Sequence, residues 1–292
     1  MNPRKYNFAM NDPFDMDAEI KLVVPKIMTS SNFMKSIKEL TVSKNCLAIW
    51  SLGQNGFIIK DHYGTLICID PYLSNYCAEA DINQNFNFRL DRQLPIFIEP
   101  EDLDVDIILI THSHDDHADP YTLSKIKKNK PVFIGPWEAY QKFKSFGINE
   151  KQCRLIHPTE ELSVRGINIF GTFSLPTDLT DLNHIGFVIK FKDDLTFYNT
   201  GDTNYTELLG YAGKFKPDIA TICINGGFNN LDTMEAVKIT KMIKPKVIIP
   251  CHYDMMINNT GNPLVFESFL NIENSVSKFH LMNYYEPYIY EK

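Results

Sequence analysis

The sequence predicts an α+β protein whose strands and helices form a four-layer αβ/βα sandwich. Short apolar runs end near residues 110, 134, 199, 224 and 250, and their lengths and flanking residues are typical of buried strands. Stretches with the helical spacing of apolar residues lie between several of these runs. Polar residues that suit a functional site recur at the carboxyl ends of the strands. Two such halves suggest two sheets packed against each other, with helices outside.

Residues 1–45 are predicted to form a leader, and residues 46–292 to form one domain. The leader contains a stretch punctuated by prolines and then a predicted helix over residues 31–40. An apolar stripe at helical spacing is more often packed on a core than used as a partner site, so this helix is expected to dock on the domain. The stripe consists of Phe33, Met34, Ile37 and Leu40.

The domain is expected to begin with strands, which dominate residues 46–71. Residues 74–104 then form a loop that is long for a compact domain, and long loops of this kind are often functional. Strands and helices alternate after this loop. The predicted strands cover residues 105–110, 131–134, 195–199, 218–224 and 246–250, and the predicted helices cover about 120–129, 136–146 and 233–243.

Composition excludes several classes of protein. A hydrophobic fraction of 44% over 292 residues is ordinary for a globular chain, and no apolar run is long enough to span a membrane. Residues 1–17 carry acids and prolines and lack the apolar segment of a secretory signal. The six cysteines show no Cys-x-x-Cys pairing, so reduced thiols in a cytoplasmic enzyme are expected. Cys251 is interpreted as a packed core thiol rather than a metal ligand.

The net charge of −7 argues against nucleic acid as the default partner, because polyanion binding usually brings a basic face. The dense basic run at residues 125–130 is predicted to end the helix that begins near residue 120, where cations suit the helix dipole. The expected partner is therefore a small-molecule substrate, with no membrane involved. A homo-oligomer is possible.

Residues 111–117 read Thr-His-Ser-His-Asp-Asp-His and follow directly on the apolar run at 105–110. Imidazoles and a carboxylate are ligands that suit zinc, manganese or iron rather than calcium or magnesium. Four such groups on one short loop are too many for one closed tetrahedral site. The pattern favours two ions that stay open to water, as in a hydrolase, over a polar surface turn. The four candidate ligands are His112, His114, Asp116 and His117.

Other strands deliver similar residues. His184 stands at the start of an apolar run, Asp202 follows Gly201 after the strand at 195–199, and His252 follows the strand at 246–250. Asp70 comes directly after an apolar run that ends at residue 69. Open sheets place their sites at the carboxyl ends of strands, so these side chains are candidates for the same site.

This constellation resembles the metallo-β-lactamase superfamily, whose His-x-His-x-Asp-His loop, later His, Gly-Asp and final His are matched in order over about residues 46–256. The resemblance implies the sandwich arrangement of the two halves and two divalent ions, zinc or manganese first and iron as a possibility. The first ion would be held by His112, His114 and His184, the second by Asp116, His117 and His252, with Asp202 bridging both and Asp70 orienting ligands from behind them.

A narrower resemblance is to the L-ascorbate-6-phosphate lactonase family. It rests on residues 47–57, 132–136 and 201–205, and on Lys-Val-Ile-Ile-Pro at 246–250 running on to His252-Tyr-Asp. The stretch between Thr172 and His184 is much shorter than in that family, and its long C-terminal extension is lacking. The resemblance implies that Arg92, and secondly Arg89, could bind a substrate phosphate.

Two further residues are candidates for substrate contact. Tyr205 matches a family tyrosine and could bond a substrate oxygen, although a packed tyrosine is an equally good interpretation. Asn225 ends the strand at 218–224 and should lie near the metals, although with Gly226 and Gly227 it could simply form a tight turn.

The predicted function is that of a metal-dependent hydrolase, in which hydroxide activated by two metals attacks the substrate and Asp202 or Asp116 accepts its proton. The first candidate reaction is ring opening of a phosphorylated sugar lactone. The alternative is hydrolysis of nucleotide, RNA or lipid phosphodiesters. A di-iron protein that reduces oxygen or nitric oxide is disfavoured, since such proteins typically carry Glu at the position of His114. A module with a dead site is disfavoured by the complete ligand set.

Overall fold

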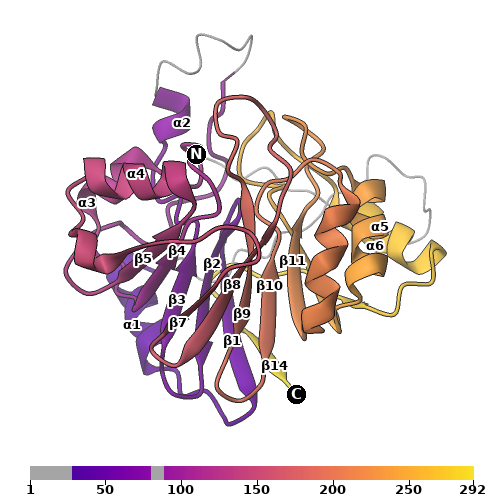
Figure 1. The fold of residues 1–292 in the computed structure, drawn as a ribbon, viewed down its shortest axis with the longest axis horizontal. Coiled ribbons are helices and arrows are strands. Elements are labelled where there is room, and N and C mark those ends of the chain that lie inside the picture. Colours follow the sequence, from indigo (N-terminus) through magenta and orange to yellow (C-terminus); the bar gives the residue numbers. More distant parts are fainter. Residues whose placement is uncertain (1–27, 80–88) are drawn as a thin grey trace.

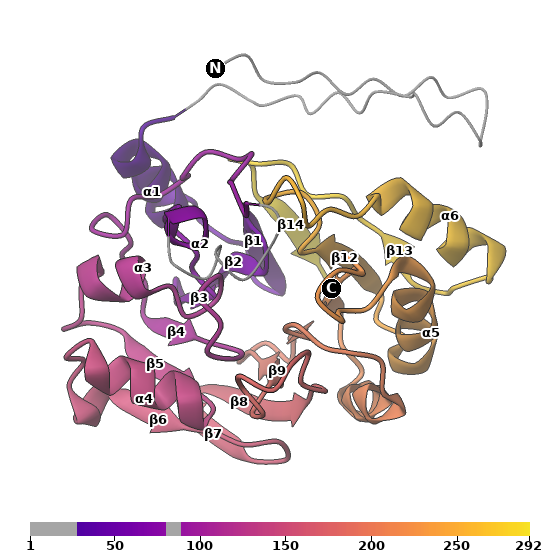
Figure 2. The same ribbon diagram turned by 90° about the horizontal axis from the view of Figure 1, so that it is seen from above.

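The computed structural model describes residues 28–79 and 89–292, and within them two seven-stranded sheets pack face to face (Figures 1 and 2). The first sheet has the order β14-β1-β2-β3-β4-β5-β6, and the second has the order β13-β12-β11-β10-β9-β8-β7. The predicted α+β sandwich is therefore confirmed.

The strands of the first sheet are β1 (Cys46–Gly53), β2 (Gly56–Asp61), β3 (Leu66–Ile69), β4 (Ile107–Leu109), β5 (Val132–Gly135), β6 (Cys153–Leu155) and β14 (Tyr288–Glu291). Those of the second sheet are β7 (Glu161–Val164), β8 (Ile167–Phe173), β9 (Ile185–Lys190), β10 (Thr196–Asn199), β11 (Ile219–Cys223), β12 (Val247–Cys251) and β13 (Lys278–Phe279).

The helices lie on the outer faces of the two sheets, and Figure 2 shows one set beside each sheet. They are α1 (Ser30–Glu39), α2 (Tyr76–Glu79), α3 (Pro120–Lys125), α4 (Trp137–Ser145), α5 (Thr233–Ile243) and α6 (Pro263–Ile272), with 3₁₀ turns at η2 (Glu150–Gln152) and η3 (Glu207–Phe215). In the described parts of the chain, no helix has the length and apolar character that crossing a bilayer requires.

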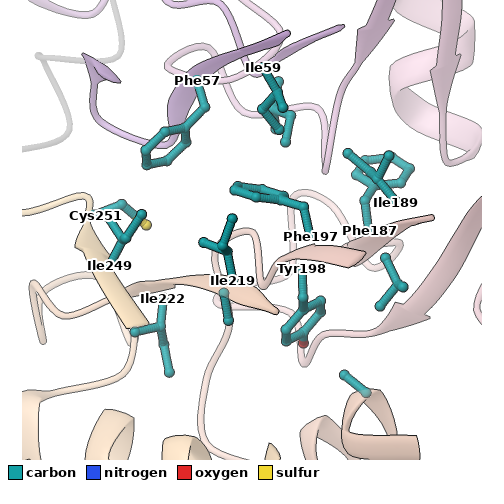
Figure 3. Packing of buried hydrophobic residues seen from close by; sticks show 14 of the residues in the cluster. Phe57, Ile59, Phe187, Ile189, Phe197, Tyr198, Ile219, Ile222, Ile249 and Cys251 are labelled. Carbon is teal, nitrogen blue, oxygen red and sulfur yellow. The ribbon is translucent and has the colours of Figure 1, made fainter. Parts of the chain in front are cut away.

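Alternation along the strands of the first sheet divides their side chains between two layers of the core. In β1, Leu47 and Ile49 point between the sheets, whereas Ala48 and Trp50 point to the helices outside. Phe57 and Ile59 of β2 face Phe197 of β10 across the central layer, as Figure 3 shows. Strands buried on both faces explain why the sequence shows continuous apolar runs rather than a period of two.

The leader helix packs on this outer layer. Phe33, Met34 and Ile37 of α1 are buried, and the Phe33 ring meets Tyr285 edge-on with centroids 4.9 Å apart. The C-terminal strand β14 pairs with β1 and so brings Tyr285 near the helix. The predicted helix packs on the domain through its apolar stripe. The boundary between leader and domain at residue 45 stays a prediction, and residues 1–27 of the leader lie outside the described residues.

Helix α3 is shorter than predicted and ends at Lys125 instead of about residue 129. Ile126 has an extended backbone and buries its side chain in the outer core, which turns the chain out of the helix. The basic run that follows is held by local oxygens. Lys128 donates to the carbonyl of Phe146, and Lys130 donates to Asp104.

All six cysteines are buried and none is in a disulfide bond, while their reduced state stays a prediction. Cys251 packs in the central core with its Sγ 3.3 Å from Oδ1 of Asn55.

Candidate metal centre

The predicted ligands meet at one edge of the sandwich because of strand direction. Strands β3, β4 and β5 run parallel, and so do β10, β11 and β12, so their carboxyl ends lie together. Strand β9 runs antiparallel to β10, and therefore begins at the same edge. The residues at these ends are Asp70, the 112–117 loop, His184, Asp202 and His252.

One group of possible metal ligands consists of His112, His114 and His184, whose ligand atoms lie within 4.8 Å of one another. Nδ1 of His184 lies 3.1 Å from the carbonyl oxygen of Asp202, and Nδ1 of His112 lies 3.0 Å from Oγ1 of Thr111. Nε2 of His112 and Nε2 of His184 are buried and have no hydrogen-bond partner. Two buried nitrogens left open on adjacent rings fit a metal ion that takes both lone pairs.

A second group consists of Asp116, His117 and His252. Nε2 of His252 lies 3.3 Å from Oδ2 of Asp116 and 3.2 Å from Oδ2 of Asp202. Nε2 of His117 lies 3.4 Å from Oδ1 of Asp202 and has no hydrogen-bond partner. Asp202 also forms a third group with His112 and His117, so its carboxylate lies between the two sets, where a bridging ligand belongs.

Asp70 has the position expected of a residue that orients ligands. Its Oδ2 lies 2.8 Å from Nδ1 of His117 and accepts hydrogen bonds from Oγ1 of Thr111 and Nδ2 of Asn55, both 2.6 Å away. Its Oδ1 accepts the backbone N–H of Thr111 at 2.8 Å. The carboxylate thus fixes the His117 ring and the start of the ligand loop together.

Three residues with side chains at this edge have a left-handed backbone. Gln54, Asp70 and His252 have φ angles of 53°, 40° and 58°, in the left-handed region that side chains with a Cβ rarely adopt. Gly201 has a φ of 62°, and a Cβ there would lie 2.9 Å from both the carbonyl oxygen of Ile185 and Cβ of Thr111. Only glycine fits this approach, which brings Asp202 against the ligand loop. Strain of this kind is typical of functional sites.

Charges in the site compete with burial. Burial lowers the pKa of His252, but Asp202 and Asp116 outweigh it and raise that pKa to about 9. The pKa of His117 is also raised, since the same two carboxylates and Asp70 overcome its burial. Burial would raise the pKa of Asp202, but His252 and His117 hold it well below its usual range. The carboxylates therefore hold positive charge at this site, which a divalent ion would supply in place of protons.

Sequence reasoning missed two amides that hold the carboxylates. Nε2 of Gln54 lies 2.7 Å from Oδ2 of Asp116 and 3.1 Å from Nε2 of His252. Nδ2 of Asn230 donates to Oδ2 of Asp202 at 2.6 Å. The tight Gly-Gln-Asn-Gly turn between β1 and β2 was a usable signal for Gln54, since it points two amides at the same edge. Nothing in the surroundings of Asn230 distinguished it.

The guanidinium of Arg92 contacts backbone oxygens rather than the candidate metal ligands. It donates to the carbonyls of Tyr72, Ser74, Leu94 and Pro95 at 2.9–3.2 Å. It also lies over the Tyr72 ring, 5.1 Å from the centroid. These contacts favour a role in holding the loop before β4, and binding of a substrate phosphate stays a prediction. Arg89 is paired with Asp91 at 3.0 Å.

Tyr205 is half-buried against the central core, with Lys238 5.7 Å from its ring centroid. Asn225 donates to Oδ1 of Asn259 at 2.7 Å and to the carbonyl of Gly227, and its own Oδ1 is buried without a partner. An open acceptor on Asn225 suits a donor from a ligand, whereas the packing of Tyr205 suits a structural residue. Substrate contact by either residue stays a prediction.

Comparison with known proteins identifies the family of this chain. The family described as "Beta-lactamase superfamily domain" matches residues 48–252. A UPF0173 metal-dependent hydrolase of Thermoplasma volcanium is 33% identical over 177 residues, which are 59% of this chain and 76% of that protein. A protein named "Probable L-ascorbate-6-phosphate lactonase UlaG" from Escherichia coli is 22% identical over 272 residues, which are 78% of this chain and 75% of that protein.

Among solved structures, that of Igni18, a metallo hydrolase from Ignicoccus hospitalis, has a TM-score of 0.66 at 21% identity, covering 85% of this chain and 99% of that one. This likeness shows the fold. The family match spans most of the chain and includes every predicted ligand from residue 112 to residue 252. The chain therefore belongs to the metallo-β-lactamase superfamily and is a metal-dependent hydrolase.

Proposed function

We propose that this hydrolase uses two divalent ions, zinc or manganese, to open the ring of a lactone. The observation that carries the proposal is the pair of ligand groups at one sheet edge, with buried and unpartnered Nε2 atoms on His112, His117 and His184. Burying such nitrogen atoms is costly unless a hydrogen-bond donor or a metal ion takes their lone pairs. Imidazole with carboxylate is a donor set that suits these metals. When bound, the ions would activate water at neutral pH and polarise the acyl oxygen of the substrate.

The chain's own carboxylates would handle the proton. Asp202 and Asp116 lie within 3.5 Å of ring nitrogens from both His117 and His252, so each would stand beside the attacking water. Gln54 and Asn230 each donate to one oxygen of these carboxylates, which fixes their orientation. One oxygen of Asp202, Oδ1, has no hydrogen-bond partner and could accept the proton.

The lactone is proposed from similarity to the named lactonase, which extends over 78% of this chain. A phosphorylated sugar lactone is the first substrate to test for the same reason. The contacts of Arg92 with four carbonyls argue against a phosphate contact at that residue and do not bear on ring opening. The test must therefore separate the lactone from the phosphate.

The experiment compares three substrates with the manganese- or zinc-loaded protein: a phosphorylated sugar lactone, the same lactone without phosphate, and bis-p-nitrophenyl phosphate. Ring opening releases a proton, which a weakly buffered indicator dye records. We expect turnover of at least one lactone, loss of that turnover on chelation, and recovery when metal is restored. Faster hydrolysis of the phosphodiester than of both lactones would overturn the proposal in favour of a phosphodiesterase.

A further inference from the structure

The segment between β8 and β9 contacts the ligand loop at His114 and Ser113. Nε2 of His114 lies 3.0 Å from Oγ1 of Thr180 and 3.4 Å from Oδ1 of Asp178. Thr180 is in turn bound to Asp178, since its hydroxyl and its backbone N–H both donate to Oδ1 of that residue, at 2.6 Å and 2.7 Å. The three side chains form a chain of hydrogen bonds that ends on a carboxylate.

The direction of this chain fixes which nitrogen of His114 is free. The hydroxyl proton of Thr180 goes to Asp178, so Oγ1 of Thr180 must accept a hydrogen bond from Nε2–H of His114. A neutral imidazole with its proton on Nε2 has its lone pair on Nδ1. This lone pair is the one that His114 can offer to an ion shared with His112 and His184.

The same segment is anchored to the ligand loop at two further points, both after Thr180 in the chain. Oδ2 of Asp181 accepts the backbone N–H of Ser113 at 2.7 Å, directly before His114 in the chain. The backbone N–H of Ile185 donates to the carbonyl of Thr111 at 3.1 Å, directly after His184. Asp181 is buried and its other oxygen accepts the N–H of Asn183. The segment from 178 to 184 therefore supplies one ligand and holds a second.

The contribution of the His114 contact to folding is small. Asp178, Leu179 and Thr180 are exposed, and hydrogen bonds between exposed groups add little to stability because water replaces them. The buried Asp181 already fixes the segment. This contact stabilises the fold little, but it links the ring of the candidate ligand His114 to a carboxylate, so its main effect is on that ring.

We propose that Thr180 and Asp178 are positioning residues for His114 and that they set the affinity of the ion held by His112, His114 and His184. The inference rests on the proposed two-ion site. The other ion would depend on Asp70, which contacts His117, and on Gln54, which contacts Asp116. Thr180 and Asp178 would thus act on the first ion, whereas Asp70 would act on both, since it also reaches His112 through Oγ1 of Thr111.

The test measures metal binding rather than turnover. Zinc is titrated into the metal-free full-length protein against a chromophoric chelator, which gives the number of ions and the Kd of each. We expect Thr180→Val and Asp178→Asn to weaken one of two ions by about 10- to 100-fold and to leave the other within about twofold. Thr180→Ser keeps the hydroxyl and should bind both ions as the wild type does.

Two controls separate positioning from structural damage. Leu179→Ala changes an exposed residue between the two and should leave both affinities unchanged. The unfolding temperature of each metal-free variant should match that of the wild type. Wild-type affinities in Thr180→Val and Asp178→Asn, or an equal loss in Thr180→Ser and Thr180→Val, would overturn the proposal.

The outcome also separates this inference from the proposed function. A wild-type protein that binds a single ion would contradict the two-ion hydrolase. The role of Thr180 would then be judged on that ion: weaker binding in Thr180→Val supports it, and unchanged binding overturns it.

Discussion

Oδ2 of Asp70 lies 2.8 Å from Nδ1 of His117, and neither side chain has any exposed surface. Because the carboxylate accepts a hydrogen bond from Nδ1–H, Nε2 is the nitrogen of His117 that can bind a metal, and it lies within 3.5 Å of Asp116 and Asp202. Asp70, which is not itself a candidate metal ligand, therefore sets the tautomer of the candidate ligand His117.

Replacing Asp70 with asparagine should therefore weaken metal binding. Asparagine tolerates the left-handed backbone at this position, where φ is 40°, so the variant tests charge rather than strain. We expect the Kd of the ion bound by His117 to rise by about 10- to 100-fold. Asp194→Asn is the matched control, since Asp194 also has a positive φ but is exposed. Equal affinities in the two variants would show that the contact does not tune the ligand.

Asp202→Ala removes the carboxylate that lies between the two ligand groups. We expect kcat to fall by about 10³-fold or more, because a bridging ligand and a proton acceptor are lost together. Metal content, measured on the purified protein by emission spectroscopy, should fall below that of the wild type. Glu207→Ala, an exposed acid five residues later, should change neither quantity. Full turnover in Asp202→Ala would contradict the assigned site.

The metal ligands could be predicted from sequence because their residue types are rare together. His112, His114, Asp116 and His117 follow one buried strand within six residues, and imidazole with carboxylate is a donor set that suits zinc, manganese or iron. Parallel strand direction then brings Asp202 and His252 to the same edge. The sandwich followed from the same strands. Two of the larger differences are that α3 ends early because Ile126 is buried, and that α6 (Pro263–Ile272) was not predicted.

The supporting residues could not be predicted in this way. Gln54 is 62 residues from Asp116, Thr180 is 66 residues from His114, and Asn230 is 28 residues from Asp202. Amides and hydroxyls are frequent in loops, so no pattern marks the few that reach a ligand. Arg92 shows the opposite error. Its position in the sequence suggested a substrate contact, and nothing in the sequence indicated that backbone carbonyls surround its guanidinium.

Lys60 should stabilise the leader helix. Its ammonium is buried and donates to the carbonyls of Ile37, Lys38 and Leu40 at 2.6–2.9 Å, at the C-terminus of α1, where a cation also suits the helix dipole. Lys60→Met leaves these carbonyls without a donor, so we expect the free energy of unfolding to fall by about 2 kcal/mol. Urea unfolding followed by tryptophan fluorescence measures this. Exposed Lys44→Met is the control, and a loss of less than about 0.5 kcal/mol in Lys60→Met would contradict the role.

Arg92→Met separates loop holding from substrate binding. Removing a donor to four carbonyls should lower the free energy of unfolding by about 3 kcal/mol. The ratio of KM for a phosphorylated lactone to KM for the unphosphorylated lactone should stay within about twofold of the wild-type ratio. Arg89→Met, at an exposed ion pair, should cost less than about 1 kcal/mol. A selective rise in KM for the phosphorylated substrate would instead restore Arg92 as a phosphate ligand.

Asp104 should make stability depend on pH in acid. Hydrogen bonds from Lys130 and Lys38 lower the pKa of Asp104 from 3.8 to about 2. A carboxyl whose folded pKa is depressed stabilises the fold above its unfolded pKa, and this contribution is lost as pH falls from about 4 to about 2. Because both lysines are partly exposed, screening reduces the contribution to about 1 kcal/mol at pH 7.

Asp104→Asn should therefore be less stable than the wild type in urea at pH 7, and the difference should shrink steadily toward pH 3. Glu101→Gln, an exposed acid three residues earlier, should show no such convergence. A gap between Asp104→Asn and the wild type that stays constant with pH would mean that packing, not the ion pairs, accounts for the loss.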